Sequence, residues 1–284
     1  MIERSDIETE FAVIPNQFLF VYGLKKQEEP FHLVHYLALE SCLRVNKPDN
    51  IYFFYHYEPY GPYWMKIRPH LTLVKVEPNS LIRRFRYGFW NRGCRFYRYA
   101  HHADFIRLDK LLVMGGIYAD IDTLFVNPLP PWLFEKTFVL GREHEICDAK
   151  GKSHSSLCNA LIMSEAEAPF GRLWRNAMDQ AFNGSWSNHS TLLPHRLSAE
   201  NPELIHIEPP RSFYRYMWTR EGIRHLLEEC DRDFTGIYNI HLWAHLWWSK
   251  ERRDFSDFHA GLLTESFVRD KDTTYNIAAR PFLP

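Results

Sequence analysis

The chain has 284 residues, of which 45% are hydrophobic and 24% are charged, and its formal net charge at pH 7 is −1. This composition is ordinary for a globular protein, and the balanced charge points to no particular charged partner. The polar, acidic start of the chain is unlike a signal peptide, and no stretch approaches the roughly 20 apolar residues of a membrane-spanning helix.

The N-terminal part of the chain predicts alternating strands and helices. Residues 1–16 are expected to form a loose leader. An apolar run with helical spacing predicts a helix that starts at Pro30 and ends near Asn46. Short runs rich in aromatic and β-branched residues predict strands at 17–22, 51–55 and 71–76. The order strand, helix, strand indicates a parallel α/β unit.

Residues 80–103 have an unusual composition and are expected to form a basic-aromatic flap. No acidic residue lies between Glu77 and Asp104. The flap would cover an anionic ligand, contact anionic lipid head groups or line a nucleic-acid groove, and a solvated arginine face is the structural alternative. The groove is disfavoured because it needs a longer charged track. The six arginines and seven aromatic residues are Arg83, Arg84, Arg86, Arg92, Arg95, Arg98, Phe85, Tyr87, Phe89, Trp90, Phe96, Tyr97 and Tyr99.

The central segment of the chain delivers two carboxylates to one place. An apolar, helix-like run over 105–114 leads into two glycines, and a short β-prone run then precedes Asp120 and Asp122. Residues two apart in a strand point to the same face, so both aspartates are expected to point together. Their charges repel unless a cation lies beside them. The pair therefore predicts a divalent metal that holds a diphosphate.

A second pair lies upstream on the same predicted helix. Asp104 and Arg107 are three residues apart and share a helix face. They form either a plain helical salt bridge or part of a sugar site, in which a carboxylate accepts from hydroxyl groups and a guanidinium donates to them.

The C-terminal half continues the α/β pattern. Strands are predicted at 137–140, 159–163, 204–207 and 238–243, and helices at 168–182 and 222–230. Residues 142–157 are rich in Gly, Ser and Lys and are expected to form a flexible loop. Four residues in and beside this loop are of types that bind zinc, namely His144, Cys147, His154 and Cys158. Their spacing disfavours a zinc site. No repeat or linker is visible, so residues 1–284 are expected to form a single domain.

The five cysteines are odd in number and scattered along the chain. This distribution predicts free thiols in a reducing compartment rather than a disulfide framework. The expected location is the cytoplasm, with the inner face of a membrane as an open alternative and with peripheral membrane contact through the flap.

The central segment resembles a known family. The run Ala-Asp-Phe-Ile-Arg at 103–107, followed by Gly-Gly-Ile-Tyr-Ala-Asp-Ile-Asp at 115–122, is similar to the donor-sugar-binding region of glycosyltransferases with the Asp-X-Asp motif. The closest resemblance is to glycosyltransferase family 32, whose general pattern is shared with the glucosylating bacterial toxins. Every key position of Ser/Ala-Asp-x-x-Arg … Gly-Gly-x-Tyr-x-Asp-x-Asp is present.

The resemblance implies an α/β nucleotide-sugar-binding fold of the GT-A type with a mostly parallel central sheet. It implies a hexosyltransferase that moves a sugar from a nucleoside diphosphate sugar to a saccharide or glycolipid acceptor, with retention at the anomeric carbon. The expected donor is a uridine or guanosine diphosphate sugar, with uridine favoured. The expected cofactor is Mn²⁺ or Mg²⁺, and the expected process is polysaccharide biosynthesis. Nucleic acid is not expected as a partner.

The resemblance also assigns site residues. Asp122 is the expected direct metal ligand, and Asp120 is expected to bind the nucleotide or the metal. His241 is placed near the metal, with His245 as the alternative, and Trp247 near the nucleotide. No catalytic nucleophile is identified. The expected donor-sugar residues are Asp104, Arg107, Gly116, Tyr118 and Asn159.

Departures from the family pattern leave other contacts open. The usual opening Ile-Pro-Lys-x-Ile-His-Gln is replaced here by Ile-Pro-Asn-Gln-Phe-Leu-Phe at 14–20, and Leu246 stands where a serine precedes the late tryptophan. Two rival classes remain. One is a metal-dependent phosphodiesterase that would also need Asp109, and the other is a non-catalytic sugar-nucleotide-binding protein.

Overall fold

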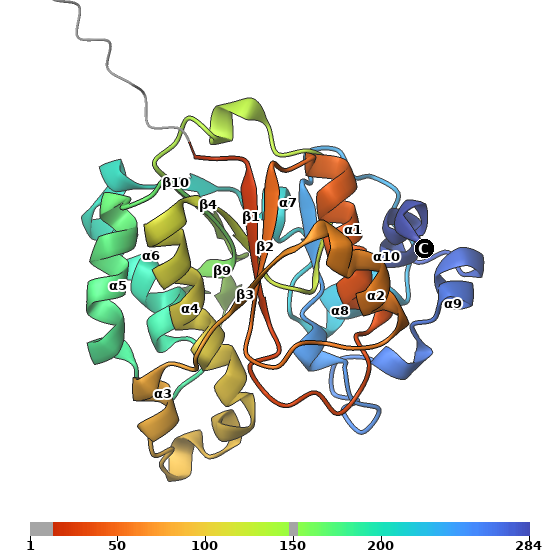
Figure 1. Ribbon diagram of the computed structural model, residues 1–284, viewed down its shortest axis with the longest axis horizontal. Helices are drawn as coiled ribbons and strands as arrows, with labels where there is room; N and C mark the ends of the chain where they lie inside the picture. The colour runs from red at the N-terminus through yellow and green to blue at the C-terminus, as the bar shows by residue number, and fades with distance from the viewer. Residues whose placement is uncertain (1–13, 148–152) are drawn as a thin grey trace, which may run out of the picture.

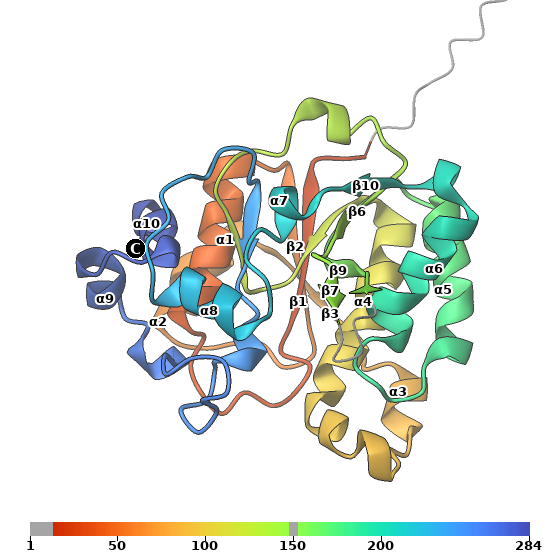
Figure 2. The same cartoon turned by 180° about the vertical axis from the view of Figure 1, so that it is seen from behind.

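The computed structural model describes residues 14–147 and 153–284. A seven-stranded sheet in the order β10-β6-β9-β4-β1-β2-β3 forms the middle layer. Helices α4, α5 and α6 cover one face, and α1, α2, α8 and α10 lie on the other side (Figure 1, Figure 2). Only β9 runs antiparallel to its neighbours within the described sheet. The expected α/β class with a mostly parallel central sheet is confirmed.

The first half of the chain follows the predicted order. The structure has β1 (Gln17–Tyr22), α1 (Leu33–Asn46), β2 (Asn50–Tyr55), α2 (Pro62–Ile67) and β3 (Thr72–Lys75). The helix α1 begins later than predicted because His32 caps it, accepting a hydrogen bond from the Val34 N–H. The helix α2 has six residues, too few to show a helical period in the sequence.

The basic-aromatic flap is helical. It contains α3 (Ser80–Arg84), the 3₁₀ turns η2 (Phe89–Asn91) and η3 (Gly93–Tyr97), and the start of α4 (Arg98–Met114). The helix α4 therefore begins before the predicted position 105. The flap projects from the α/β body at the lower end of the molecule in Figure 1.

The second half also confirms the predicted strands and helices, with small shifts at their ends. Its strands are β4 (Gly116–Ala119), β5 (Thr123–Phe125), β6 (Phe138–Arg142), β7 (Ile146–Cys147), β8 (Ser153–His154), β9 (Leu157–Ser164), β10 (His206–Glu208) and β11 (Asn239–His241). Its helices are α5 (Pro169–Ala181), the π-helical turn η5 (Asn188–Leu192), α6 (Leu193–Glu200), α7 (Pro210–Phe213), α8 (Arg220–Leu227), α9 (Glu265–Asp270) and α10 (Thr274–Ala279).

The expected leader and loop are described only in part. Residues 1–13 and 148–152 lie outside the described residues. Ile14, at the end of the expected leader, is buried and donates its N–H to the Phe134 carbonyl at 2.8 Å. Within 142–157, the short strands β7 and β8 pair antiparallel. The side chains of Cys147 and His154, which the zinc alternative needs, are not described.

Two hydrophobic cores hold the layers together. One joins the sheet to α1, α8 and α10, and the other joins it to α4 and α5. Strands β4, β5 and β9 are buried along their whole length, as expected for a sheet covered on both faces. Cys42, Cys94, Cys158 and Cys230 are free thiols. Among the described helices, none combines the length and the hydrophobicity needed to cross a bilayer.

A glycine corner sets the direction of β4. Gly115 and Gly116 have φ angles of 66° and 109°, which an L side chain rarely adopts. A Cβ on Gly116 would lie 2.5 Å from the Gln17 carbonyl oxygen of β1. Gly116 opens β4, about 13 Å of strand away from Asp120 at four residues of separation. The expected donor-sugar contact from Gly116 therefore disagrees with its placement, because the glycine serves the packing of β4 on β1.

We expect Gly116→Ala to destabilise the protein. The strained backbone alone costs about 1–3 kcal/mol, and the clash with a main-chain oxygen adds to it. Gly93→Ala is the control, because a Cβ there meets no atom within 4 Å. Chemical denaturation measures both variants, and equal free energies of unfolding for the two would contradict the role given to Gly116.

Candidate functional site

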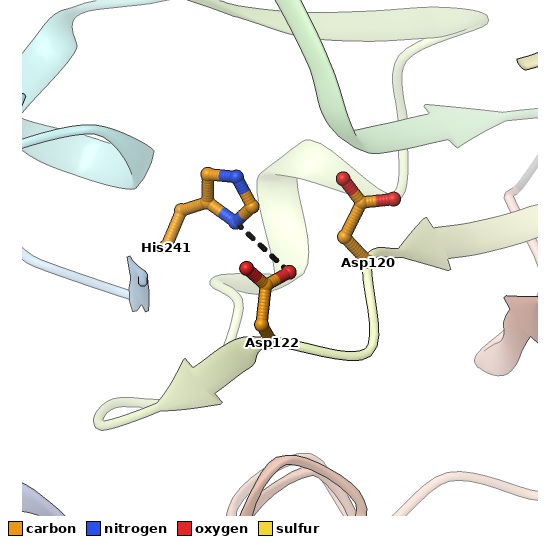
Figure 3. A group of neighbouring side chains, drawn as sticks. All are labelled: Asp120, Asp122 and His241. Atoms are coloured by element: carbon orange, nitrogen blue, oxygen red, sulfur yellow. Dashed lines mark ion pairs between the residues drawn. The ribbon is translucent and has the colours of Figure 1, made fainter. Parts of the chain in front are cut away.

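The two central aspartates lie in a turn at the carboxyl end of β4. The Asp120 N–H donates to the Ala160 carbonyl of β9 at 2.8 Å, and the Thr123 N–H donates to the Asp120 carbonyl at 3.0 Å, which closes the turn. The expectation that both residues lie on one face of a strand is wrong, because β4 ends at Ala119. The turn, rather than strand alternation, brings the two carboxylates near each other (Figure 3).

A distant strand brings His241 to the same place. Strand β11 pairs antiparallel with β5, and His241 lies opposite Thr123. The Leu242 N–H donates to the Asp122 carbonyl at 3.0 Å. As a result, His241 Nδ1 lies 3.6 Å from Asp122 Oδ1 (Figure 3).

The three side chains form a group that fits a divalent cation. One ligand atom each from Asp120, Asp122 and His241 lies within 4.8 Å of the others. His241 Nδ1 is buried and has no hydrogen-bond partner among the described residues. A buried polar atom of this kind normally has a partner, and carboxylate oxygens and imidazole nitrogens are common metal ligands. His245 is not part of this group.

The two aspartates differ in their protonation. Burial raises the pKa of Asp120, although Arg107 opposes this effect. Burial also acts to raise the pKa of Asp122, but His241 and the Ala244 N–H, which donates to Asp122 Oδ2 at 2.8 Å, bring its pKa below the usual value. Asp122 is therefore the more firmly ionised of the two.

Arg107 joins the aspartate turn to the helix α4. Its Nη2 atom lies 3.2 Å from Asp104 Oδ1 and 3.2 Å from Asp120 Oδ1. Its Nη1 donates to the Asn159 carbonyl at 2.6 Å, and the guanidinium lies 4.4 Å from the centre of the Tyr118 ring. Burial acts to lower the pKa of Arg107, but Asp120 and the other anionic neighbours raise it above its usual value.

Asp104 is almost fully engaged by the protein. Its Oδ1 accepts from Asn159 Nδ2 at 2.8 Å, and its Oδ2 contacts His189 Nε2 at 2.9 Å. Burial acts to raise its pKa, but Arg107 and His189 lower it below the usual value. A carboxylate offers about four acceptor positions, so roughly one remains for a ligand. The predicted helix-face pairing of Asp104 and Arg107 is confirmed.

His189 is a site residue that sequence reasoning missed. It lies in the π-helical turn η5, far along the chain from Asp104. No periodic or motif signal points to it, because the surrounding Ser-Asn-His-Ser stretch reads as an ordinary loop. Its ring is fully buried against Phe105 and Phe182.

His35 is a second residue that the sequence did not reveal. Its Nδ1 lies 3.4 Å from the carbonyl of Ile121, the residue between the two aspartates, and its ring stacks on Trp248 at 5.2 Å. Burial lowers the pKa of His35 to about 3, so the ring is neutral near pH 7. The helix α1 thereby holds the aspartate turn from the opposite side to Arg107.

Two expected ligand contacts do not agree with their placement. The Tyr118 side chain is buried, and its hydroxyl donates to Asp120 Oδ1 at 2.5 Å, so it positions Asp120 rather than offering surface to a sugar. Trp247 is 0% exposed, and its Nε1 donates to the Leu242 carbonyl at 2.6 Å. A fully buried indole has no face for a nucleotide. The sequence could not distinguish a tryptophan of the core from one of the site.

An aromatic wall stands beside the metal-fitting group. It consists of Tyr97, Trp186 and His245, with ring centres 4.9 Å apart for Trp186 and His245 and 5.4 Å apart for Tyr97 and Trp186. Trp186 is 39% exposed. Burial lowers the pKa of His245 to about 4. The wall meets Asp122 through His245, which directly follows Ala244, the residue whose N–H donates to Asp122 Oδ2.

A family model and a curated relative both match this chain. Residues 63–139 match the family described as "Glycosyltransferase sugar-binding region containing DXD motif". The chain is 31% identical over 280 residues to Glucan organizing enzyme 1 of Cryptococcus neoformans var. grubii, covering 95% of this chain and 71% of the relative.

Similar solved structures are remote. The PaToxG glycosyltransferase has 15% sequence identity and a TM-score of 0.45, with 67% of this chain and 71% of that chain covered. The glycosyltransferase GlyE of Streptococcus pneumoniae TIGR4 has 13% identity and a TM-score of 0.43, with 85% and 57% covered.

We expect Arg107→Met to lower the free energy of unfolding by about 3–5 kcal/mol at pH 7, because it leaves the buried carboxylate of Asp104 and the partly buried carboxylate of Asp120 without their cation. In the variant, burial raises the pKa of Asp104 above its unfolded value, so the folded state regains stability below that pKa. In the parent protein the pKa of Asp104 is lowered by folding, so the parent loses stability as the pH falls toward that pKa. The deficit should therefore shrink between pH 7 and pH 4.5 in chemical denaturation.

Arg224→Met is the matched control for this prediction. Arg224 is 51% exposed and pairs with Glu228 at the surface, where such a pair contributes little to stability. A deficit for Arg107→Met no larger than that of the control would contradict the role given to Arg107.

Proposed function

This chain belongs to the glycosyltransferases whose sugar-binding region contains the DXD motif, and from that premise we propose that it transfers a hexose from a nucleoside diphosphate sugar with the help of a divalent metal. It is an enzyme, and its partners are a sugar donor and an acceptor. A uridine diphosphate sugar is the donor we propose. Membership of family 32 and a cytoplasmic location stay predictions.

The observation that carries this proposal is the convergence of Asp120, Asp122 and His241, where His241 Nδ1 is buried and finds no hydrogen-bond partner in the described part of the chain. We propose that Asp122 and His241 bind the ion directly and that Asp120 binds it directly or through water. Asp122 is the firmer ligand because its pKa is lowered. Of the two expected ions, Mn²⁺ is favoured over Mg²⁺, because Mg²⁺ prefers oxygen ligands.

The ion would neutralise the charge that builds up on the leaving diphosphate. The chain's own residues orient the donor sugar. Arg107 has five N–H donors, and Ala103, Asn159, Asp104 and Asp120 engage most of them. About one donor of Arg107 and one acceptor position of Asp104 remain. We propose that these two groups hydrogen-bond the hydroxyl groups of the donor sugar, and that Asn159 lies beside them in the sugar site.

We propose that the reaction retains the anomeric configuration without an enzyme nucleophile. The Asp104 carboxylate is held by Arg107, Asn159 and His189, and Asp120 is held by Tyr118 and Arg107, so neither is free to attack. The bond from the anomeric carbon to the diphosphate oxygen breaks, and a bond to the acceptor oxygen forms on the same face. The acceptor proton passes to the leaving phosphate oxygen.

The acceptor we propose is a saccharide, free or linked to a lipid, that stacks on the aromatic wall. Sugar rings carry apolar C–H faces that pack on aromatic side chains, and Trp186 offers an exposed ring that packs on His245. The name of the fungal relative refers to glucan, which supports a role in polysaccharide biosynthesis.

The rival classes fit less well. A two-metal phosphodiesterase needs several converging carboxylates, but Asp109 points away from the site and pairs with Arg175 at 2.5 Å. A non-catalytic sugar-nucleotide-binding protein would bind the donor without breaking it, so turnover separates it from the proposed enzyme.

The test of the proposed function is calorimetric titration of uridine diphosphate with and without Mn²⁺, combined with a hydrolysis screen across nucleotide sugars. We expect Mn²⁺-dependent binding and slow hydrolysis of one donor, with the released sugar first appearing in the donor's anomeric configuration by NMR. Asp122→Asn and His241→Gln should weaken Mn²⁺ binding by at least about 10-fold, because changing even a residue that only supports a metal ligand typically costs about 10- to 100-fold in affinity.

Asp109→Asn and His245→Gln serve as controls for metal binding and should retain it. Equal binding of Mn²⁺ and nucleotide by Asp122→Asn would contradict the metal assignment. Binding without hydrolysis of any donor would favour the non-catalytic class instead.

We also expect Trp186→Ala to raise the KM for a saccharide acceptor by about 3- to 10-fold, the effect of losing one aromatic contact, while the KM for the donor stays unchanged. Trp132→Ala is the control, because Trp132 is 40% exposed but packs on His206 of β10. Initial rates at varied acceptor concentration provide the measurement. A rise in the KM for the donor alone would show that Trp186 contacts the donor rather than the acceptor.

A further inference from the structure

The basic-aromatic flap exposes three large apolar rings at once. Phe89 is 81% exposed, Trp90 is 92% exposed and Phe96 is 78% exposed. All three lie in the turns η2 and η3, at the projecting end of the flap (Figure 1). Clustered exposure of this kind on a globular protein marks an interaction surface.

Other aromatic residues of the flap point inward and hold it on the body. Phe85 packs on Phe182 with ring centres 4.7 Å apart, and the Tyr87 hydroxyl hydrogen-bonds His101 Nδ1 at 2.7 Å. The flap is therefore anchored by one set of rings and presents another set to solvent. The exposed rings are not the result of a missing core.

The flap also carries unpaired positive charge. Arg83, Arg84, Arg86, Arg92 and Arg95 are exposed, and among the described residues none of them forms an ion pair with a carboxylate. The flap contains no acidic residue, whereas the whole chain has 34 Lys and Arg against 35 Asp and Glu. Positive charge is thus concentrated in the flap while the rest of the chain is acidic.

We propose that the flap docks on the surface of a membrane that contains anionic lipids. The arginines would bind the phosphates of the head groups, and Phe89, Trp90 and Phe96 would enter the boundary between head groups and acyl chains, where aromatic rings are favoured. A soluble polyanion would satisfy the arginines but would leave the three apolar rings in water. The combination of both features favours the lipid surface.

Docking would bring the site close to the membrane. Tyr97 ends η3 and belongs to the aromatic wall, and the next residue starts α4, which carries Asp104 and Arg107. This orientation rests on the proposed function and fits a lipid-linked acceptor. The docking itself does not depend on that function.

The experiment is flotation of the full chain with vesicles of phosphatidylcholine alone and of phosphatidylcholine mixed with phosphatidylserine, without any donor. We expect at least about 10-fold more binding to the anionic vesicles, and we expect added salt to weaken that binding because it screens charge. The triple variant Phe89→Ser, Trp90→Ser, Phe96→Ser and the quadruple variant Arg83→Gln, Arg84→Gln, Arg92→Gln, Arg95→Gln should each lose about 10-fold.

Matched controls change exposed residues outside the flap. Met65→Ser with Leu262→Ser removes exposed apolar side chains, 74% and 46% exposed, and Arg224→Gln with Arg253→Gln and Arg269→Gln removes exposed charges. These controls should bind vesicles like the parent protein. Unchanged thermal unfolding of all variants shows that the flap changes act on binding rather than on folding.

Three results would overturn the proposal. The first is equal binding to neutral and anionic vesicles, or no binding to either. The second is full vesicle binding by the aromatic variant, which would make the flap a general polyanion site. A single-stranded oligonucleotide that displaces the parent protein and the aromatic variant from vesicles equally well would lead to the same conclusion. The third is self-association of the parent protein in ultracentrifugation that the aromatic variant abolishes, which would make the rings a contact between two copies.

The two proposals fail independently. Donor hydrolysis by the aromatic variant should match that of the parent protein, since none of its three residues contacts the site. Vesicle binding without hydrolysis of any donor would support the membrane docking and contradict the proposed sugar transfer. Hydrolysis without vesicle binding would do the reverse.

Discussion

The buried guanidinium of Arg107 is the interaction on which the site depends. It lies 3.2 Å from carboxylate oxygens of both Asp104 and Asp120, where two anions would otherwise repel each other in a region of low dielectric. Because Arg107 belongs to α4 and also donates to the Asn159 carbonyl of β9, the same cation ties the helix layer to the carboxyl end of the sheet. Arg107 therefore both neutralises the two carboxylates and holds α4 against β9.

Arg107 also explains why the two aspartates of the motif differ. It neutralises Asp120 from the side of α4, whereas His241 and the Ala244 N–H face Asp122 from the side of β11. Asp120 is therefore shared between a fixed protein cation and the metal-fitting group. Asp122 has no arginine and keeps a lowered pKa. Arg107 already neutralises Asp120, and the proposed ion would neutralise Asp122.

The sequence predicted the local parts of this arrangement and missed the long-range ones. The spacing of Asp104 and Arg107 was sufficient to place both on one helix face, because a helix has a fixed period. The convergence of Asp120 with Asp122 depends on a turn held by Ala160 of β9, and the approach of His189 to Asp104 depends on a π-helical turn. Neither contact has a periodic signal. The family resemblance supplied His241, but it could not show that Trp247 is buried.

The helix α4 links the buried site to the projecting flap. Its 17 residues begin at Arg98, inside the flap, and end at Met114, before the glycine corner. With a rise of 1.5 Å per residue, the nine steps from Arg98 to Arg107 span about 14 Å. Arg107 and Asp104 fix this helix to β4 and β9, so the flap cannot move far without disturbing the buried ion pairs. Any surface that the flap binds is therefore held at a set distance from the sugar site, and the charge pairing that stabilises the site also orients the whole molecule on that surface.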